Sequence, residues 1–193
     1  MTDFERLTTL KREVEPCFIY KNENGENFVY DIYMIGDIEN PANYIDAIQI
    51  IRYANPGDSI MIHLNSNGGD LFSALQICSA IKSSRAEVYC NVEGMCASAA
   101  TLIFFAAHEV NIEEHSIFLF HTYSTTIGFK KSHELSAQVV HDLAWVKSIL
   151  TKTYTPFLSK EEIASVLEGK DLWMNTAEVL RRYVKIKRLT KKT

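Results

Sequence analysis

Residues 59–100 decide the fold, and they read SIMIHLNSNGGDLFSALQICSAIKSSRAEVYCNVEGMCASAA. Two β-prone runs, residues 59–64 and 87–92, each lead into a turn of small residues that opens a helix. After the first turn, Leu71, Leu75 and Cys78 recur at helical spacing. A strand, a helix and a second strand of these lengths predict a right-handed crossover that joins two parallel strands.

Upstream of this stretch, the sequence predicts a hairpin, a buried strand and a helix. The β-prone runs at residues 17–20 and 27–30 flank an Asn-Gly turn, which is a good hairpin signal. Residues 31–36 are apolar enough to form a buried strand. Asn40 followed by Pro41 is typical of a helix start, because Asn caps the first turn and Pro fits its first position.

Downstream, residues 117–120 predict a further strand and residues 131–150 a long helix. Ser159 and Asn175 each precede a Glu by three residues, which indicates two more helix starts. Because strands alternate with helices along the chain, we predict an α/β protein with a mainly parallel sheet.

Length and composition indicate a single domain over residues 1–193. The chain has 193 residues, of which 47% are apolar and 23% charged, as in soluble globular proteins with a hydrophobic core. The net charge of −4 gives no electrostatic reason to expect nucleic acid or a membrane surface as a partner. The sequence predicts neither a signal peptide nor a membrane span, so we expect a cytoplasmic protein. The basic segment 185–193 is expected to be a solvated, partly frayed terminus.

The four cysteines are scattered and show no CxxC pair; they are Cys17, Cys78, Cys90 and Cys96. No histidine lies near them at metal-ligand spacing, so buried free thiols fit better than a zinc site or a disulfide framework. Neither a metal nor a cofactor is expected.

The junction GMCASAA at residues 94–100 is the first candidate for chemistry. A serine at the start of a helix projects its hydroxyl beside backbone N–H groups that have no partner within the helix. The small residues around Ser98 would let a substrate backbone approach closely. A serine needs a base and an oxyanion site to act as a nucleophile, and by composition alone Ser98 is better explained as a small packing residue.

The turn NSNGG at residues 65–69 is the second candidate. Two glycines between a strand and a helix expose backbone N–H groups in a nest that suits an anion or a developing oxyanion. A phosphate loop would end in Gly-Lys-Ser or Gly-Lys-Thr, whereas Asp70 and Leu71 follow here. A plain strand-to-helix turn remains the alternative.

His121 is the third candidate, among six histidines in the chain. It directly follows the apolar strand at residues 117–120, so its backbone would be fixed at the edge of the sheet. This position suits a general base, although a single histidine is more often structural.

Together these features resemble the proteolytic subunit of Clp protease. Residues 32–124 contain, in that family's order and spacing, a strand with Gly36, the turn at residues 65–69, the junction that ends in Ser98 and the strand that leads to His121. The later run KDLWMNTAE, residues 170–178, is similar to the family's segment of a basic residue, Asp and an aromatic residue before an Ala-Glu helix.

The resemblance implies a serine peptidase with Ser98 as nucleophile, His121 as general base and Asp171 as the acid that orients the base. Its oxyanion donors would be the backbone N–H groups of Gly69 and Ala99. In such a triad the base takes the serine proton and delivers it to the leaving amine, while the acid stabilises the imidazolium. Other acids are available for the third role, namely Glu161, Glu162, Glu168 and Asp142.

The resemblance also implies the architecture and the partners. The fold would consist of repeated β-β-α units, as in Clp protease and crotonase, with an extended helix for ring assembly. We expect a homo-oligomer, either a seven-membered ring or stacked rings, that cleaves peptides or unfolded proteins and can work with an AAA+ unfoldase. The predicted helix at residues 131–150 supports assembly, because it carries more apolar residues than one buried stripe needs.

Several positions depart from the family pattern. Asn67 stands where the family usually has Pro, and Asn tolerates such a turn. Residues 122–129 contain one glycine, whereas the family has a Gly-rich strand that binds substrate and pairs two rings. Residues 1–30 carry a hairpin in place of the family's axial loop, and Glu93 falls near an apolar pocket for the unfoldase. A divergent or viral member that acts alone is therefore an alternative.

Three other functions compete with this interpretation. A crotonase-like acyl-CoA enzyme is expected to share the fold and the oxyanion loops, but it would not need a Ser–His pair. A catalytically inactive scaffold subunit would not need an intact set of Ser98, His121 and Asp171. A signal-peptide peptidase relative would use a Ser–Lys pair and a membrane anchor. Reaction with a fluorophosphonate separates the first of these from a serine peptidase.

Overall fold

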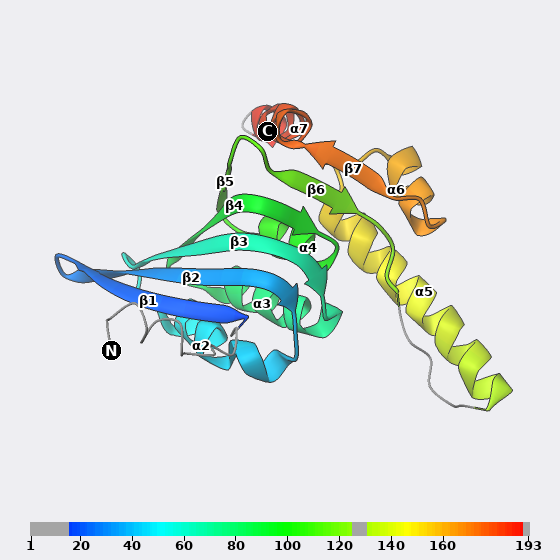
Figure 1. Cartoon of the computed structure of the whole chain (residues 1–193), viewed down its shortest axis with the longest axis horizontal. Helices are drawn as coiled ribbons and strands as arrows, with labels where there is room; N and C mark the ends of the chain where they lie inside the picture. The colour runs from blue at the N-terminus through cyan, green and yellow to red at the C-terminus, as the bar shows by residue number, and fades with distance from the viewer. Residues whose placement is uncertain (1–15, 125–130, 191–193) are drawn as a thin grey trace, which may run out of the picture.

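A computed structural model describes residues 16–124 and 131–190, and its centre is one sheet (Figure 1). Seven strands form the sheet: β1 (Cys17–Asn24), β2 (Asn27–Ile38), β3 (Ser59–Gly69), β4 (Glu87–Ala97), β5 (Glu109–Ile112), β6 (Ile117–Phe120) and β7 (Leu172–Asn175). Their order is β1-β2-β3-β4-β6-β7, with β5 paired to the first half of β4. The pairs β2–β3, β3–β4, β4–β5 and β4–β6 are parallel, which confirms the predicted α/β fold.

The two antiparallel pairs lie at the edges of the sheet. At one edge, β1 and β2 form the predicted hairpin around Gly25, which has a φ of 65°. Strand β2 continues without a break to Ile38, so the run at residues 27–30 and the buried strand at residues 31–36 are one strand. At the other edge, β7 pairs with β6. Neither β5 nor β7 is predicted from the sequence, because four residues are too few to show a period of two.

Helices cover one face of the sheet and extend beyond its edge (Figure 1). The helices are the short 3-10 turn η1 (Pro41–Tyr44), α2 (Ile45–Tyr53), α3 (Leu71–Ser83), α4 (Ala99–Ala106), α5 (Ser132–Tyr154), α6 (Lys160–Leu167) and α7 (Thr176–Thr190). The predicted caps are present: Ala42 N–H donates to the Asn40 side chain, Ser159 forms a capping box with Glu162, and Glu178 N–H donates to Asn175. The predicted basic tail starts inside α7, so its first residues are helical.

The core lies between the sheet and helices α2, α3 and α4. Alternate residues of β3 and β4 face it and are completely buried; they are Ile60, Ile62, Leu64, Val88, Cys90 and Val92. Next to these strands, the Phe104 ring packs edge to face on Phe118 and the Tyr154 ring edge to face on Phe120, while Phe118 and Phe120 are stacked. Burying this apolar area stabilises the fold by about 25 cal/mol per Å². The packing also fixes β6 and the end of α5 relative to α4.

The opposite face of the sheet is polar where β2, β3 and β4 meet. His63 lies between two carboxylates, with Nδ1 2.5 Å from Glu93 Oε1 and Nε2 3.1 Å from Asp31 Oδ1. Its ring stacks on Tyr33 with centroids 4.2 Å apart. Burial acts to lower the pKa of His63, but the hydrogen bonds to Glu93 and Asp31 outweigh it and raise the pKa above its ordinary value. Glu93 is therefore part of a polar cluster on this face.

Candidate active site

The carboxyl ends of β3 and β4 bring the two predicted turns side by side. A Cβ added to Gly68 would lie 2.6 Å from Ala97 O and 2.6 Å from Ser98 Cβ, so only glycine allows this approach. Gly68 has a φ of 90° and Gly69 a φ of 140°, conformations that other residues rarely adopt. Ligands of parallel sheets bind outside the carboxyl ends of the strands, and this is where the two turns meet.

Ser98 occupies a strained turn between β4 and α4. Its φ of 55° and ψ of −126° make it the one non-glycine residue with a positive φ in the described part of the chain. Such a conformation costs on the order of 1–3 kcal/mol and persists where its surroundings fix it. Here Ser98 N–H donates to Leu119 O at 2.9 Å, and Thr101 N–H donates to Ser98 O at 3.0 Å. A strained strand-to-helix turn is also the geometry that exposes the nucleophile in α/β-hydrolases.

A cavity of about 670 Å³ opens at these turns. Four of the five predicted site residues line it: Ser98, His121, Gly69 and Ala99. Helix α5 forms the facing wall with Trp145, Val146, Ile149 and Leu150, and Phe72 at the start of α3 stacks on Trp145 with centroids 5.5 Å apart. A cleft of this size accommodates a few residues of a peptide.

His121 follows β6 and is half-buried on the cavity wall. Its Nε2 is the one buried side-chain nitrogen or oxygen without a hydrogen-bond partner among the side chains that the structure describes. Buried polar atoms are rarely left without a hydrogen-bond partner. An unpaired imidazole nitrogen on a cavity wall can accept a proton during a reaction. The same strand holds Ser98 through Leu119, two residues before His121.

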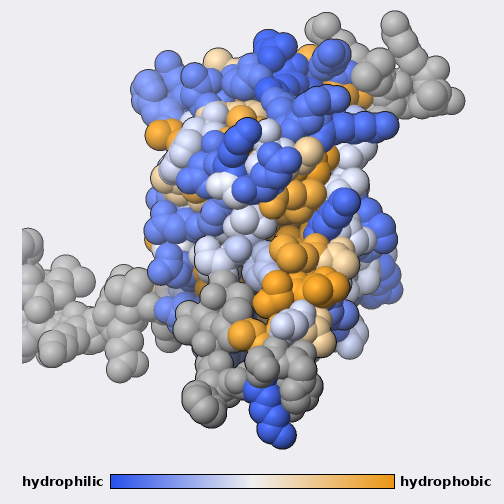
Figure 2. All heavy atoms as spheres, turned by 90° about the vertical axis from the view of Figure 1, so that its right-hand side faces the viewer, coloured by the Kyte–Doolittle hydropathy of each residue, from blue (hydrophilic) through white to orange (hydrophobic). Residues whose placement is uncertain are grey.

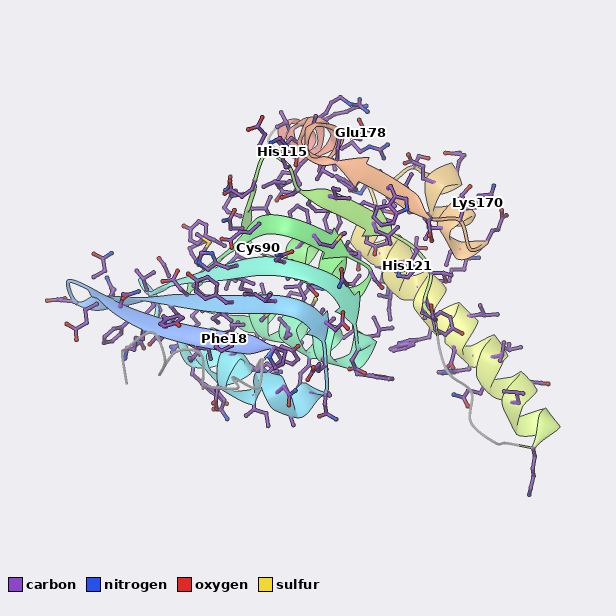
Figure 3. All side chains as sticks on the ribbon, viewed as in Figure 1. Phe18, Cys90, His115, His121, Lys170 and Glu178 are labelled. Atoms are coloured by element: carbon purple, nitrogen blue, oxygen red, sulfur yellow. The ribbon has the colours of Figure 1, made fainter. Side chains whose placement is uncertain are left out.

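Asp171 precedes β7, and the strand register places it beside His121. Leu172 pairs with Phe120 in the antiparallel ladder, so the next pair beyond the ladder is Asp171 and His121. Figure 3 shows His121 at the end of β6 and Lys170, the neighbour of Asp171, at the same end of β7. Asp171 is exposed, does not line the cavity and is not hydrogen-bonded to His121. Catalytic hydrogen bonds often tighten only when substrate is bound.

The cavity carries negative charge. Asp37, Asp70 and Asp142 line it, and no lysine or arginine does among the described residues. The Asp70 carboxylate caps α3, because it accepts from Ser73 N–H at 2.7 Å and from the Ser73 hydroxyl at 2.8 Å. Asp37 accepts from the Asn67 side chain at 3.4 Å, and Asp142 Oδ1 lies 3.3 Å from His141 Nδ1, so each of these carboxylates has one partner at long range. This arrangement favours cationic over acidic side chains next to the reacting bond.

The glycine turn also meets β2 closely. A Cβ on Gly69 would collide with Ile38 O, so the Gly69 backbone is held against β2. Ala99 is the first residue of α4, where N–H groups have no acceptor within the helix. Both residues line the cavity beside Ser98, as an oxyanion site would require.

Sequence reasoning did not single out Phe72, Thr101 or Tyr154 for the site. Phe72 has an exposed ring and directly follows the glycine turn, a position that by itself indicates no function. Thr101 and Tyr154 are fully buried and their side chains meet across 53 residues of sequence, a contact that no local pattern reveals. Along the described ranges, no helix has the length and apolarity to cross a membrane.

Comparison with known proteins identifies the family. The model of the Clp protease family matches residues 31–183. No curated protein matches the sequence. Among solved structures, a peptidase from Plasmodium falciparum is similar in fold, with a TM-score of 0.61 and 16% sequence identity over 79% of this chain and 91% of that chain. The family match includes the turns at residues 65–69 and 94–98, His121 and Asp171, and it spans most of the sequence. The chain therefore belongs to the Clp protease family.

Proposed function

We propose that the chain is a serine endopeptidase that uses Ser98, His121 and Asp171. One observation carries the proposal: the cavity brings the strained Ser98 turn and the unpartnered Nε2 of His121 onto the same wall as the glycine turn. Family membership supports a peptidase, and a serine beside a base can act as its nucleophile.

The chemistry follows from these positions. His121 Nε2 takes the proton of the Ser98 hydroxyl as Oγ attacks the peptide carbonyl carbon. The carbonyl oxygen becomes an oxyanion, which Gly69 N–H and Ala99 N–H stabilise. The imidazolium, oriented by Asp171, then protonates the leaving amine, and the C–N bond breaks to give an acyl-enzyme. Water attacks the ester with His121 again as base, which releases the acid and restores the serine.

The substrate is an extended chain. An extended backbone exposes the main-chain groups that a strand-like site can bind without demanding particular side chains. A folded domain would not enter a cavity of about 670 Å³. Apolar side chains fit against the α5 wall, and the carboxylates of Asp37 and Asp142 favour lysine or arginine nearby.

A comparison of unfolded and folded substrates tests this function. A short unstructured fluorogenic peptide and a denatured protein should be cleaved, with a fluorophosphonate blocking both reactions. The same protein in its folded state should survive, because the chain has no nucleotide-binding loop to power unfolding. Fluorescence measures cleavage of the peptide, and gel electrophoresis measures cleavage of the denatured and folded protein. Rapid cleavage of the folded protein, or cleavage that a fluorophosphonate leaves untouched, would contradict the proposal.

Helix α5 is the proposed assembly surface. Val146, Leu150 and Tyr154 form its buried stripe, whereas Val140 and Leu143 are 69% and 51% exposed. The first part of α5 extends beyond the sheet (Figure 1), and Figure 2 shows apolar surface gathered on this side of the molecule. Exposed apolar patches mark interaction sites. With the family match, this surface supports a homo-oligomer, and we assign it to contacts between copies in a seven-membered ring or between stacked rings.

Leu143→Glu should reduce the oligomer to smaller species. A charge on this exposed position is tolerated in a free subunit but is costly inside an apolar interface. Ser148→Glu is the matched control, because Ser148 is exposed and lies about 140° around the helix from Leu143. Native mass spectrometry measures both variants. An unchanged mass for Leu143→Glu would exclude this face of α5 from the interface.

The face of β2, β3 and β4 that helices leave uncovered is polar, whereas an AAA+ unfoldase is expected to need an apolar pocket near Glu93. Glu93 bonds to His63, and Asn91 donates to Glu93 at 2.9 Å, so this region is polar. Asn111 in turn donates to Asn91 at 2.7 Å, which extends the polar cluster to β5. Buried aromatic and arginine side chains anchor most protein interfaces, and on this face Tyr33 is already stacked on His63. An AAA+ unfoldase that docked here would have to bind a polar surface.

A further inference from the structure

A buried pair of hydroxyl groups supports the strained turn at Ser98. Thr101 in α4 and Tyr154 at the end of α5 are 0% and 1% exposed. The Thr101 hydroxyl lies 2.6 Å from Ser98 O and 2.7 Å from the Tyr154 hydroxyl. The proposed mechanism with Ser98, His121 and Asp171 uses neither side chain. Two consecutive hydrogen bonds thus connect the Tyr154 hydroxyl, through the Thr101 hydroxyl, to the main-chain carbonyl of Ser98, the proposed nucleophile.

The direction of each hydrogen bond follows from the donors available. Ser98 O is a carbonyl oxygen and only accepts, so the single proton of the Thr101 hydroxyl points toward it. The Thr101 oxygen must then accept from Tyr154, whose hydroxyl donates. Burial raises the pKa of Tyr154 far above its usual range, so this hydroxyl keeps its proton. Consecutive bonds of one direction polarise and strengthen one another.

The Ser98 carbonyl controls the orientation of the Ala99 N–H. The two groups belong to one trans peptide unit, which is planar, so they point in opposite directions. A threonine in a helix commonly bonds to the carbonyl three residues back, and this bond alone would be ordinary. Here the bonded residue is Ser98 with a φ of 55°, and a second helix holds the threonine hydroxyl in place. Fixing the carbonyl aims the Ala99 N–H at the cavity.

We propose that Thr101 and Tyr154 are positioning residues for the oxyanion site, because their hydroxyl chain holds the Ser98–Ala99 peptide plane. This inference rests on the proposed peptidase function for its kinetic consequence, although the orientation of the peptide plane does not depend on activity. Complete loss of one oxyanion donor lowers kcat by about 10²–10³. Thr101 N–H still holds Ser98 O at 3.0 Å when the hydroxyl is removed. Partial loss of alignment therefore lowers kcat by about tenfold.

Four variants of the full chain test the proposal with a fluorogenic peptide. Thr101→Val keeps the side-chain shape and removes the hydroxyl, so kcat should fall about tenfold with KM unchanged, since the oxyanion forms only in the transition state. Thr101→Ser keeps the hydroxyl and should restore the wild-type kcat. Tyr154→Phe keeps its ring packing against Phe120 and should lower kcat less, because Thr101 still donates to Ser98 O.

Thr176→Val is the matched control for lost stability. Thr176 is also buried, and its hydroxyl also has main-chain carbonyl acceptors: its single proton lies between Glu113 O at 2.9 Å and Ser116 O at 3.0 Å. It does not line the cavity. Thr176→Val should lower the melting temperature as Thr101→Val does, while kcat stays at the wild-type value. A merely structural role for Thr101 predicts the same kcat for both variants.

A crystal structure of Thr101→Val supplies a measurement besides activity. The Ser98–Ala99 peptide plane should be rotated or doubly occupied in this variant and unchanged in Thr176→Val. The proposal is overturned if the plane is unchanged in both, if Thr101→Val retains the wild-type kcat, or if Thr101→Ser is as slow as Thr101→Val. Inactivity of the unmodified chain toward every peptide would instead overturn the proposed function, and the peptide plane would still decide this inference.

Discussion

Ser98→Ala should abolish peptide hydrolysis and fluorophosphonate labelling while the fold stays intact. Loss of a triad nucleophile lowers kcat by about 10⁶, leaving the rate that the oxyanion site and binding provide. Stability should change little, because no other group depends on the Ser98 side chain: the bonds of this residue to Leu119 and Thr101 use its backbone. Alanine also adopts the positive φ of this position at about the same cost as serine. Circular dichroism, melting temperature and labelling measure the three properties.

Ser124→Ala is the control that distinguishes loss of the nucleophile from loss of any serine hydroxyl in the cavity. Ser124 is the other serine on the described cavity wall, and it is exposed. Its substitution should leave labelling in place and keep kcat within a few-fold of the wild-type value. If Ser98→Ala remained active and Ser124→Ala did not, the nucleophile would have been assigned to the wrong turn.

The parallel sheet could be predicted from the sequence because its signals are local. Apolar runs at residues 59–64 and 87–92, each followed by a small-residue turn, appear as β3 and β4. The caps at Asn40 and Ser159 depend on neighbouring residues alone, and they are present as predicted. By contrast, β7 exists only because it pairs with β6 more than 50 residues earlier in the chain. Local patterns contain no information on such pairing.

The candidate site was predictable as a set of residues but not as a geometry. The turns at residues 65–69 and 94–98 are visible in the sequence, whereas the contact between Gly68 and Ser98 depends on the parallel register of β3 and β4. The positive φ of Ser98 arises from bonds on both sides of the residue, one of them to β6. The hydroxyl pair of Thr101 and Tyr154 needs α5 to return to α4, which only the tertiary fold determines.

Asp171 and Asp142 are two acids that differ in how they lie relative to His121. Asp171 faces His121 by strand register but is exposed, whereas Asp142 lines the cavity from α5. The two positions predict different roles. An acid beside the imidazole holds the tautomer needed for proton transfer, whereas a carboxylate on the cavity wall interacts with the substrate.

Asp171→Asn should lower kcat by about 10⁴ with little change in KM, the effect expected when an amide holds the imidazole in the wrong tautomer. Asp142→Asn should leave kcat unchanged and raise KM for a peptide with lysine beside the cleaved bond, but not for the same peptide with glutamate. Steady-state kinetics on the two peptides measures both effects. Because charge attraction on an open wall is screened, the Asp142 effect should also shrink at high salt, whereas the Asp171 effect should not. A large loss of kcat in Asp142→Asn, with Asp171→Asn near wild type, would transfer the orienting role to α5. The acid would then reach His121 across the cavity, and the register of β6 and β7 would serve only to close the sheet.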